Sequence, residues 1–130
     1  MNDKPAEPQL NPEEIREVRK GVEEFNSCRF FECHETLEDV WHGIRGPGRD
    51  FFQGIIQVSV GFYHLGNGNF IGARSQLEKA LEKLAPYGDH YLGMDLAHLR
   101  GEIRSWLVRI RSGEDLRNTP ADPPKLHFEP

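Results

Sequence analysis

The segment from Asp50 to Leu65 constrains the fold most, because apolar side chains surround almost its whole circumference when it forms a helix. One face is formed by Phe51, Ile55, Val58, Phe62 and Leu65, and much of the other by Phe52, Ile56, Val60 and Tyr63. A helix that is apolar nearly all round is buried nearly all round. We therefore expect this segment to be the central helix of the fold. Gly54 and Gly61 would let a neighbouring helix approach it closely.

Start and stop signals divide most of the remaining chain into further helices, each with one apolar face. They run from Pro12, after the cap Asn11, to about Ser27; from Phe30 to the breaker Gly46-Pro47-Gly48; from the cap Asn69 to Pro86; and from Leu92 to Gly113. No segment alternates apolar and polar residues convincingly over several positions, as a strand would. We therefore expect an all-α fold, a compact array of about five helices around the central one, with no sheet.

The length of 130 residues suits one domain, which buries enough surface to fold without metal or disulfide support. Residues 1–10 are polar and contain prolines, so we expect a flexible N-terminal segment and no signal peptide. Residues 11–113 should form a single helical domain. Residues 114–130 show no periodicity and are rich in proline. We expect an extended tail there, either mobile or lying on the surface.

The charge and the cysteine content limit the classes of binding partner and the cellular compartment that we expect. The net charge is −5, from 21 acidic and 16 basic side chains, which argues against a nucleic-acid partner. No run of apolar residues approaches the ~18 of a membrane span, so we expect no membrane partner. Cys28 and Cys33 form no disulfide framework and no CxxC motif, which is typical of a cytoplasmic protein with reduced thiols. The oligomeric state is left open.

The second predicted helix carries two polar residues within its apolar face. His34 and Glu38 lie on the same side as Phe30, Leu37 and Trp41 when about 100° is assigned to each residue. A buried carboxylate without a partner is costly. Residues four apart are neighbours on a helix, so His34 and Glu38 can be each other's partner.

The predicted central helix has a polar ridge of its own, on which Gln53, Gln57 and His64 fall. Two antiparallel helices joined by a short loop are usually adjacent, so this ridge should face the second helix. We therefore expect one internal polar site, formed by His34, Glu38, Gln57 and His64, with Trp41 as its apolar wall and Gln53 near the Trp41 end.

Three interpretations of such a site are open. In the first, His34, Glu38 and His64 bind a metal, zinc or iron with an open position, or a small ligand. In the second, Glu38 tunes His34 as a general base, although neither Cys33 nor Ser59 is well placed as a nucleophile. In the third, the same residues form a buried hydrogen-bond network that fixes helix packing in a structural or protein-interaction module. Whether the chain is an enzyme is left open.

Two known metal motifs are excluded by the spacing. His34-Glu35 looks like the start of H-E-x-x-H, but Glu38 stands where the second histidine should be. The di-iron pattern of helical bundles needs Glu-x-x-His on two helices, and the chain has no such pair.

Several of these residues, taken in order, resemble a known family. The pattern is His34-x-x-x-Glu38-x-x-Trp41, then Gln53-Gly54-Ile55-Ile56-Gln57, then His64, then Gly68-Asn69-x-x-Gly72-Ala73. It resembles the bacterial and archaeal family known as domain of unknown function 309, over about Phe25 to Leu84. The resemblance implies a compact five-helix domain with orthogonal packing, and metal binding by the motif of His34, Glu38 and Trp41. It implies no reaction.

A weaker resemblance concerns the turn after the central helix, where Asn69 and Gly72 act as cap and turn residues. The segment Gly68-Asn69-Phe70-x-x-Ala73-x-x-x-Leu77-x-x-Ala80-Leu81 is similar to the turn and second helix of a tetratricopeptide repeat. One unit is visible, whereas an independent solenoid needs at least about three. Any tight helical hairpin requires similar residues. The resemblance keeps open a groove that holds a partner's peptide.

Overall fold

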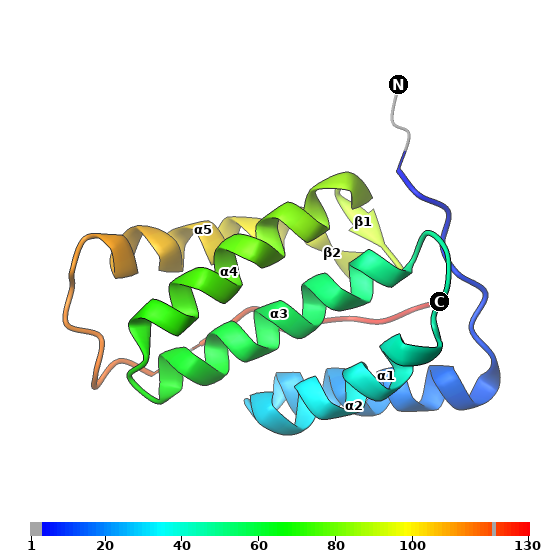
Figure 1. The fold of residues 1–130 in the computed structure, drawn as a ribbon, viewed down its shortest axis with the longest axis horizontal. Coiled ribbons are helices and arrows are strands. Elements are labelled where there is room, and N and C mark those ends of the chain that lie inside the picture. The colour runs from blue at the N-terminus through cyan, green and yellow to red at the C-terminus, as the bar shows by residue number, and fades with distance from the viewer. Residues whose placement is uncertain (1–3, 121) are drawn as a thin grey trace.

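A computed structural model describes residues 4–120 and 122–130 of the chain (Figure 1). Its α-helices are α1 (Pro12–Asn26), α2 (Phe30–Gly43), α3 (Arg49–Gly66), α4 (Phe70–Leu84) and α5 (Leu96–Arg111). The expected all-α fold class is confirmed. None of the helices within these described ranges is both long and apolar enough to cross a lipid bilayer.

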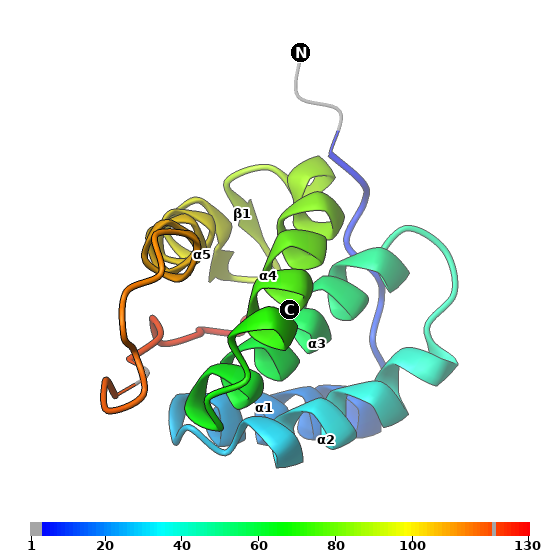
Figure 2. The same ribbon diagram turned by 60° about the vertical axis from the view of Figure 1, so that its left-hand side comes forward.

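The helix α3 is the centre of the fold, as its apolar circumference predicts. Figure 1 shows it crossing the molecule with α1 and α2 on one side and α4 on the other, and Figure 2 shows α1 and α2 side by side. A side chain at Gly54 would meet Leu84 Cδ2 at 2.8 Å, and one at Gly61 would meet Leu77 Cδ2 at 2.7 Å. Both glycines therefore allow the close approach of α4 that the sequence predicts.

The turn between α2 and α3 is held by Arg49, the first residue of α3. Its Nη1 donates hydrogen bonds of 2.9 Å to the carbonyl oxygens of both Trp41 and Ile44. Its guanidinium carbon lies 4.0 Å from the centroid of the Trp41 ring, a cation–π contact. These contacts satisfy two carbonyls at the C-terminal end of α2 and fix α2 against the start of α3.

The region before α5 differs from the prediction. In place of a helix from Leu92, a short hairpin pairs β1 (His90–Tyr91) with β2 (Met94–Asp95), after a 3₁₀ turn (Ala85–Tyr87). Leu92 and Gly93 form its turn with φ of +50° and +80°, values that a helix cannot contain. The helix starts after Asp95, whose Oδ1 accepts a 2.9 Å hydrogen bond from His98 N. The two-residue strands are too short to show alternation in the sequence.

The described parts of the C-terminal segment, residues 114–120 and 122–130, return across the helices without forming a helix or strand (Figure 1). Leu126 and Phe128 are buried in the core. Asn26, at the end of α1, bonds both backbone groups of Leu126: Nδ2 donates to its oxygen at 2.9 Å, and Oδ1 accepts from its nitrogen at 2.7 Å. Farther along, Glu129 N donates to Leu92 O at 2.8 Å. The segment thus links α1 to the hairpin.

The N-terminal segment also contacts the hairpin. Tyr91 donates its hydroxyl to Ala6 O at 2.6 Å, and Leu92 N donates to Glu7 Oε2 at 2.7 Å. These contacts concern residues 4–10, since residues 1–3 lie outside the described part of the chain. The flexibility expected of residues 1–10 stays a prediction.

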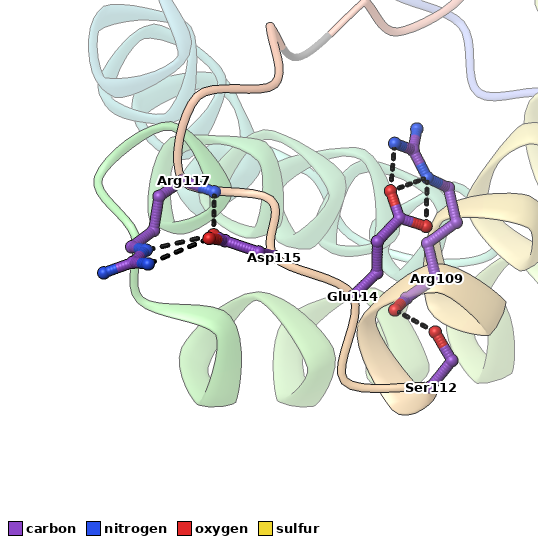
Figure 3. Close-up of polar contacts among 5 residues, drawn as sticks. All are labelled: Arg109, Ser112, Glu114, Asp115 and Arg117. Carbon is purple, nitrogen blue, oxygen red and sulfur yellow. Dashed lines mark hydrogen bonds and ion pairs between the residues drawn. The ribbon is translucent and has the colours of Figure 1, made fainter.

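Ion pairs lie at the end of α5 and in the segment that follows it (Figure 3). Arg109 Nη2 lies 2.6 Å from Glu114 Oε2, and these hydrogen bonds lower the pKa of Glu114. Hydrogen bonds from Arg117 likewise lower the pKa of Asp115, to about 2. Arg111 pairs with Glu78 of α4 at 2.6 Å. Paired arginines of this kind form a solvated, charge-balanced face.

Candidate functional site

A small hollow lies between the start of α2 and the end of α3. Its volume is about 180 Å³, and it is lined by Phe30, Phe31, His34, Val60, Tyr63 and His64. We call it the α2–α3 hollow. A larger hollow of about 400 Å³ adjoins it and shares Phe30, Phe31 and Tyr63. The structure therefore brings His34 and His64 to one concave surface.

The mouth of this hollow is aromatic. Phe31 is 45% exposed and Tyr63 is 39% exposed, although large apolar side chains are mostly buried in this fold. The centroids of their rings are 5.4 Å apart, and the Phe31 and His34 rings are 5.2 Å apart. The centroids of the Tyr63 and His64 rings are 5.8 Å apart. The four rings thus follow one another in the order His34, Phe31, Tyr63 and His64, with interplanar angles of 48° to 59°.

Asn69 fixes the orientation and tautomer of His64. The Asn69 side-chain oxygen accepts a 2.9 Å hydrogen bond from Gly72 N and caps α4, so the amide nitrogen is the group that faces His64. That nitrogen lies 3.3 Å from His64 Nδ1. An amide nitrogen can only donate, so Nδ1 accepts and the neutral ring carries its proton on Nε2. His64 therefore presents a hydrogen-bond donor at Nε2.

Gly72 makes this arrangement possible. A side chain at position 72 would lie 2.6 Å from Asn69 Nδ2 and 3.0 Å from His64 Cδ2. Real side chains essentially never approach so closely, so only glycine fits against both residues. The predicted cap and turn residues thus also shape the surroundings of His64.

His34 is oriented by the backbone and faces Glu38. Its Nδ1 lies 2.9 Å from Phe31 O, and a carbonyl can only accept, so Nδ1 carries a proton. Its Nε2 then faces Glu38 Oε2 at 3.4 Å. A second proton on the ring makes this contact an ion pair. The two side chains are 24% and 43% exposed, so the pair contributes at most about 1 kcal/mol.

The expected site is not enclosed in the interior as the sequence predicts, since the His34 and Glu38 side chains are 24% and 43% exposed, and its other members are partly buried. Trp41 Nε1 and Gln57 Oε1 are buried atoms without a hydrogen-bond partner among the described residues. The lining of the α2–α3 hollow does not include Glu38, Trp41, Gln53 or Gln57. The structure joins His34 to Glu38 by an ion-pair contact and His34 to His64 by a shared hollow, but it does not bring all the expected residues together.

The donor atoms do not fit a metal centre with three protein ligands. His34 Nε2 and Glu38 supply two donors, but Nδ1 of His64 is engaged by Asn69 and its Nε2 carries the proton. Metal ligation requires a nitrogen lone pair. Across residues 4–120 and 122–130, no group of three or more His, Cys, Asp or Glu side chains is placed to hold a metal ion. We derive no chemistry through zinc or iron at this site.

Cys33 is not a nucleophile for this site. Its side chain is fully buried, and its Sγ lies 3.2 Å from Ser59 Oγ. Burial raises the pKa of the thiol to about 12, so it stays protonated at neutral pH. A protonated thiol is a poor nucleophile.

Comparison with known proteins finds a family model that matches part of the chain. Residues 18–76 match the family described as "Domain of unknown function (DUF309)". The resemblance drawn from the sequence motifs is therefore confirmed. The matched DUF309 segment contains all of α2 and α3 and the cap Asn69, so it includes every residue that lines the α2–α3 hollow.

An uncharacterized protein of Aquifex aeolicus (strain VF5) is also similar to this chain. The two are 26% identical over 105 residues, which cover 80% of this chain. The aligned segment spans 29% of the Aquifex protein, so the relative is much longer than the shared part. Its description states no activity.

Sequence reasoning missed three residues near His34, His64 and Glu38. Phe31 and Tyr63 each lie next to the hollow, but a sequence does not show which aromatic side chains stay exposed. His42 Nε2 lies 4.0 Å from Glu38 Oε1, on the side of α2 that points to solvent. Its position four residues after Glu38 was the available signal.

Proposed function

We propose that this chain binds a small planar ligand, a single ring carrying a hydrogen-bond acceptor, in the α2–α3 hollow. One observation carries the proposal: exposed aromatic rings and an imidazole donor with a fixed tautomer line the same concave surface. Ligand sites are typically apolar hollows with a few polar groups that fix orientation.

The size of the hollow supports a single ring. Its volume of about 180 Å³ is close to the roughly 150 Å³ apolar cavity that binds benzene in another protein. Sites for drug-sized molecules span roughly 300–1,000 Å³. A larger ligand would have to extend into the adjoining hollow, which Arg29 and Glu32 line.

The lining suggests a binding geometry. The ligand ring would lie against Phe31 and Tyr63, whose faces are partly open to solvent. Its acceptor would accept a hydrogen bond from His64 Nε2–H, and the His34–Glu38 pair would lie beside it. A neutral hydrogen bond of this kind contributes about 0.5–1.5 kcal/mol. The proposal involves binding, with no catalytic step.

Of the expected ligands, the small molecule is better supported than the metal, because His64 is held in the tautomer that donates rather than ligates. The alternative of a sealed structural network has less support. His34 and Glu38 are 24% and 43% exposed, so water reaches both side chains.

We also propose a cytoplasmic location without nucleic-acid partners. Cys28 and Cys33 are both free thiols, as expected in a reducing compartment. The net charge of −5 disfavours contact with phosphate backbones.

A titration with benzamide tests the binding proposal, because this probe combines a planar ring with a neutral acceptor. Cyclohexanecarboxamide, which keeps the acceptor but loses planarity, should bind more weakly. His64→Phe keeps a ring but removes the donor, and should weaken benzamide binding by about 2- to 13-fold. His98→Phe, an exposed histidine of α5, is the matched control and should bind as the wild type does. Equal benzamide affinity in both variants would refute the proposed contact.

A further inference from the structure

The opposite side of α2 forms an acidic trough with α1. Two hollows of about 410 and 370 Å³ lie along it and share Glu17 and Asp39. We call their joint surface the α1–α2 trough. Lys20 is the one basic side chain in its lining among the described residues, and the carboxylates that line it are Glu13, Glu14, Glu17, Glu24, Glu32, Glu35 and Asp39.

The trough carries a net negative charge, because seven carboxylates and Lys20 line it among the described residues. Within the described chain, none of its carboxylates forms an ion pair with a Lys, Arg or His side chain. By contrast, the carboxylates of Glu78 and Glu114 are paired with arginines on other faces. Like charges along a groove raise the local concentration of cations.

One carboxylate of the trough, that of Glu24, is largely shielded from solvent. Glu24 lines the trough and is 6% exposed, yet its Oε1 is buried and has no hydrogen-bond partner among the described residues. Burial raises the pKa of Cys33 on α2, and the charge of Glu24 raises it further, so the Glu24 carboxylate lies near that thiol. A buried carboxylate without a donor is costly, so a cationic donor reaching Glu24 would be stabilising.

The spacing of the carboxylates favours an extended cation over a metal ion. No three acidic side chains of the described chain converge closely enough to hold a metal ion. Instead, the lining residues of α1 run from Glu13 to Glu24, roughly 16 Å at 1.5 Å per residue. Separate charges along this length match a ligand whose cationic groups are also spaced.

We propose that the α1–α2 trough binds a linear polyamine, a flexible chain of protonated amines separated by methylene groups. One terminal ammonium donates to Glu24, and the other amines pair with carboxylates nearer Glu13. The methylene groups lie along Val40 and Gly43, which supply the uncharged part of the lining. A primary ammonium is the least bulky of the amine donors, which suits a carboxylate that is 6% exposed. The trough and the α2–α3 hollow have no lining residue in common, so this proposal does not rest on the one above.

Calorimetric titration with spermine at constant ionic strength tests this proposal. Glu24→Gln keeps the shape of the side chain and removes its charge, and it should weaken spermine binding by about tenfold or more. Glu82→Gln removes the same charge from an exposed site on α4 outside the trough, and should change affinity less than about twofold. Backbone amide shifts of Thr36 and Asp39 should move with spermine in the wild type.

Three results would overturn the proposal. The first is equal spermine affinity in Glu24→Gln and Glu82→Gln. The second is displacement of spermine by Mg²⁺ at the same ionic strength, which would indicate a point-charge site. The third is a tetralysine peptide that binds much more tightly than spermine, which would assign the trough to a protein partner.

Discussion

The side-chain nitrogen of Asn69 lies 3.3 Å from His64 Nδ1, while the side-chain oxygen of Asn69 accepts a hydrogen bond from Gly72 N and caps α4. One side chain thus performs a structural task and a chemical one. The cap fixes which end of the amide faces His64, and this in turn fixes the proton of the imidazole on Nε2. Helix capping and the donor of the candidate site are therefore coupled.

Replacement of Asn69 should separate these two tasks. Asn69→Ala removes the cap and should lower the free energy of unfolding by about 1 kcal/mol. Asn69→Asp keeps an acceptor for Gly72 N, so it should retain most of that stability. It also replaces the donor to His64 by an acceptor, so His64 Nδ1 should gain a proton. Urea unfolding and imidazole nitrogen NMR measure both effects, and an unchanged His64 tautomer in Asn69→Asp would contradict the coupling.

Close packing of α3 on α4 predicts opposite effects for two glycines. Gly61→Ala would bring the new Cβ to 2.7 Å from Leu77, which is fully buried, and should destabilise the fold by about 1–3 kcal/mol. Gly101→Ala, on the exposed side of α5, meets no atom within 4 Å and should stabilise it by up to about 1 kcal/mol. Denaturant unfolding compares them. A neutral Gly61→Ala variant would show that α4 does not pack this closely.

The contact of Asn26 with the C-terminal segment predicts a local loss of order. Asn26→Ala removes both hydrogen bonds to Leu126 and should lower the free energy of unfolding by about 1–3 kcal/mol. Asn26→Asp keeps the acceptor for Leu126 N and should cost less. Limited proteolysis should then cut residues 114–130 of Asn26→Ala faster than those of the wild type. Equal cleavage of the two would mean that these bonds do not hold the segment.

Local signals explain which parts of the fold the sequence predicts. Asn11 and Asn69 cap the helices expected to follow them, and the break at Gly46-Pro47-Gly48 separates α2 from α3. The hairpin before α5 was missed because its turn at Leu92–Gly93 depends on distant contacts, including Glu129 N to Leu92 O. Contacts between residues far apart in the chain leave little local trace.

In the candidate site, too, local spacing predicts some contacts, whereas others depend on how the helices pack. The contact of His34 with Glu38 follows from helical spacing, and the shared hollow of His34 and His64 follows from the adjacency of α2 and α3. Periodicity alone does not determine which side chains on the facing sides of α2 and α3 stay exposed. In the structure Gln57 lies outside the hollow, whereas Phe31 lines it and is 45% exposed.

Burial of Cys33 predicts different reactivity of the two thiols. Cys28 is exposed, whereas burial raises the pKa of Cys33 to about 12. A thiol reagent at mildly alkaline pH should therefore modify one thiol in the folded protein and both after unfolding. Cys28→Ser should leave the folded protein unreactive. Rapid modification of that variant would place Cys33 at the surface.

The same residue predicts a loss of stability at high pH. The unfolded thiol titrates near its ordinary value of 9.0, and the folded thiol only at about 12. Its contribution is thus complete below pH 9.0 and decreases as the pH rises towards 12, by roughly 1.4 kcal/mol at about pH 10. Burial also raises the pKa of Tyr87, which acts in the same direction. Cys33→Val should flatten this pH dependence in denaturant titrations, and an unchanged slope would contradict it.

The most direct test of the candidate site is imidazole NMR of the full chain during titration with benzamide. Resonances of His34 and His64 should shift together and saturate, with the His64 proton remaining on Nε2. Resonances of His98 and His127, which lie away from the α2–α3 hollow, should stay in place. Shifts of equal size at all four histidines, or none at His64, would contradict ligand binding between α2 and α3.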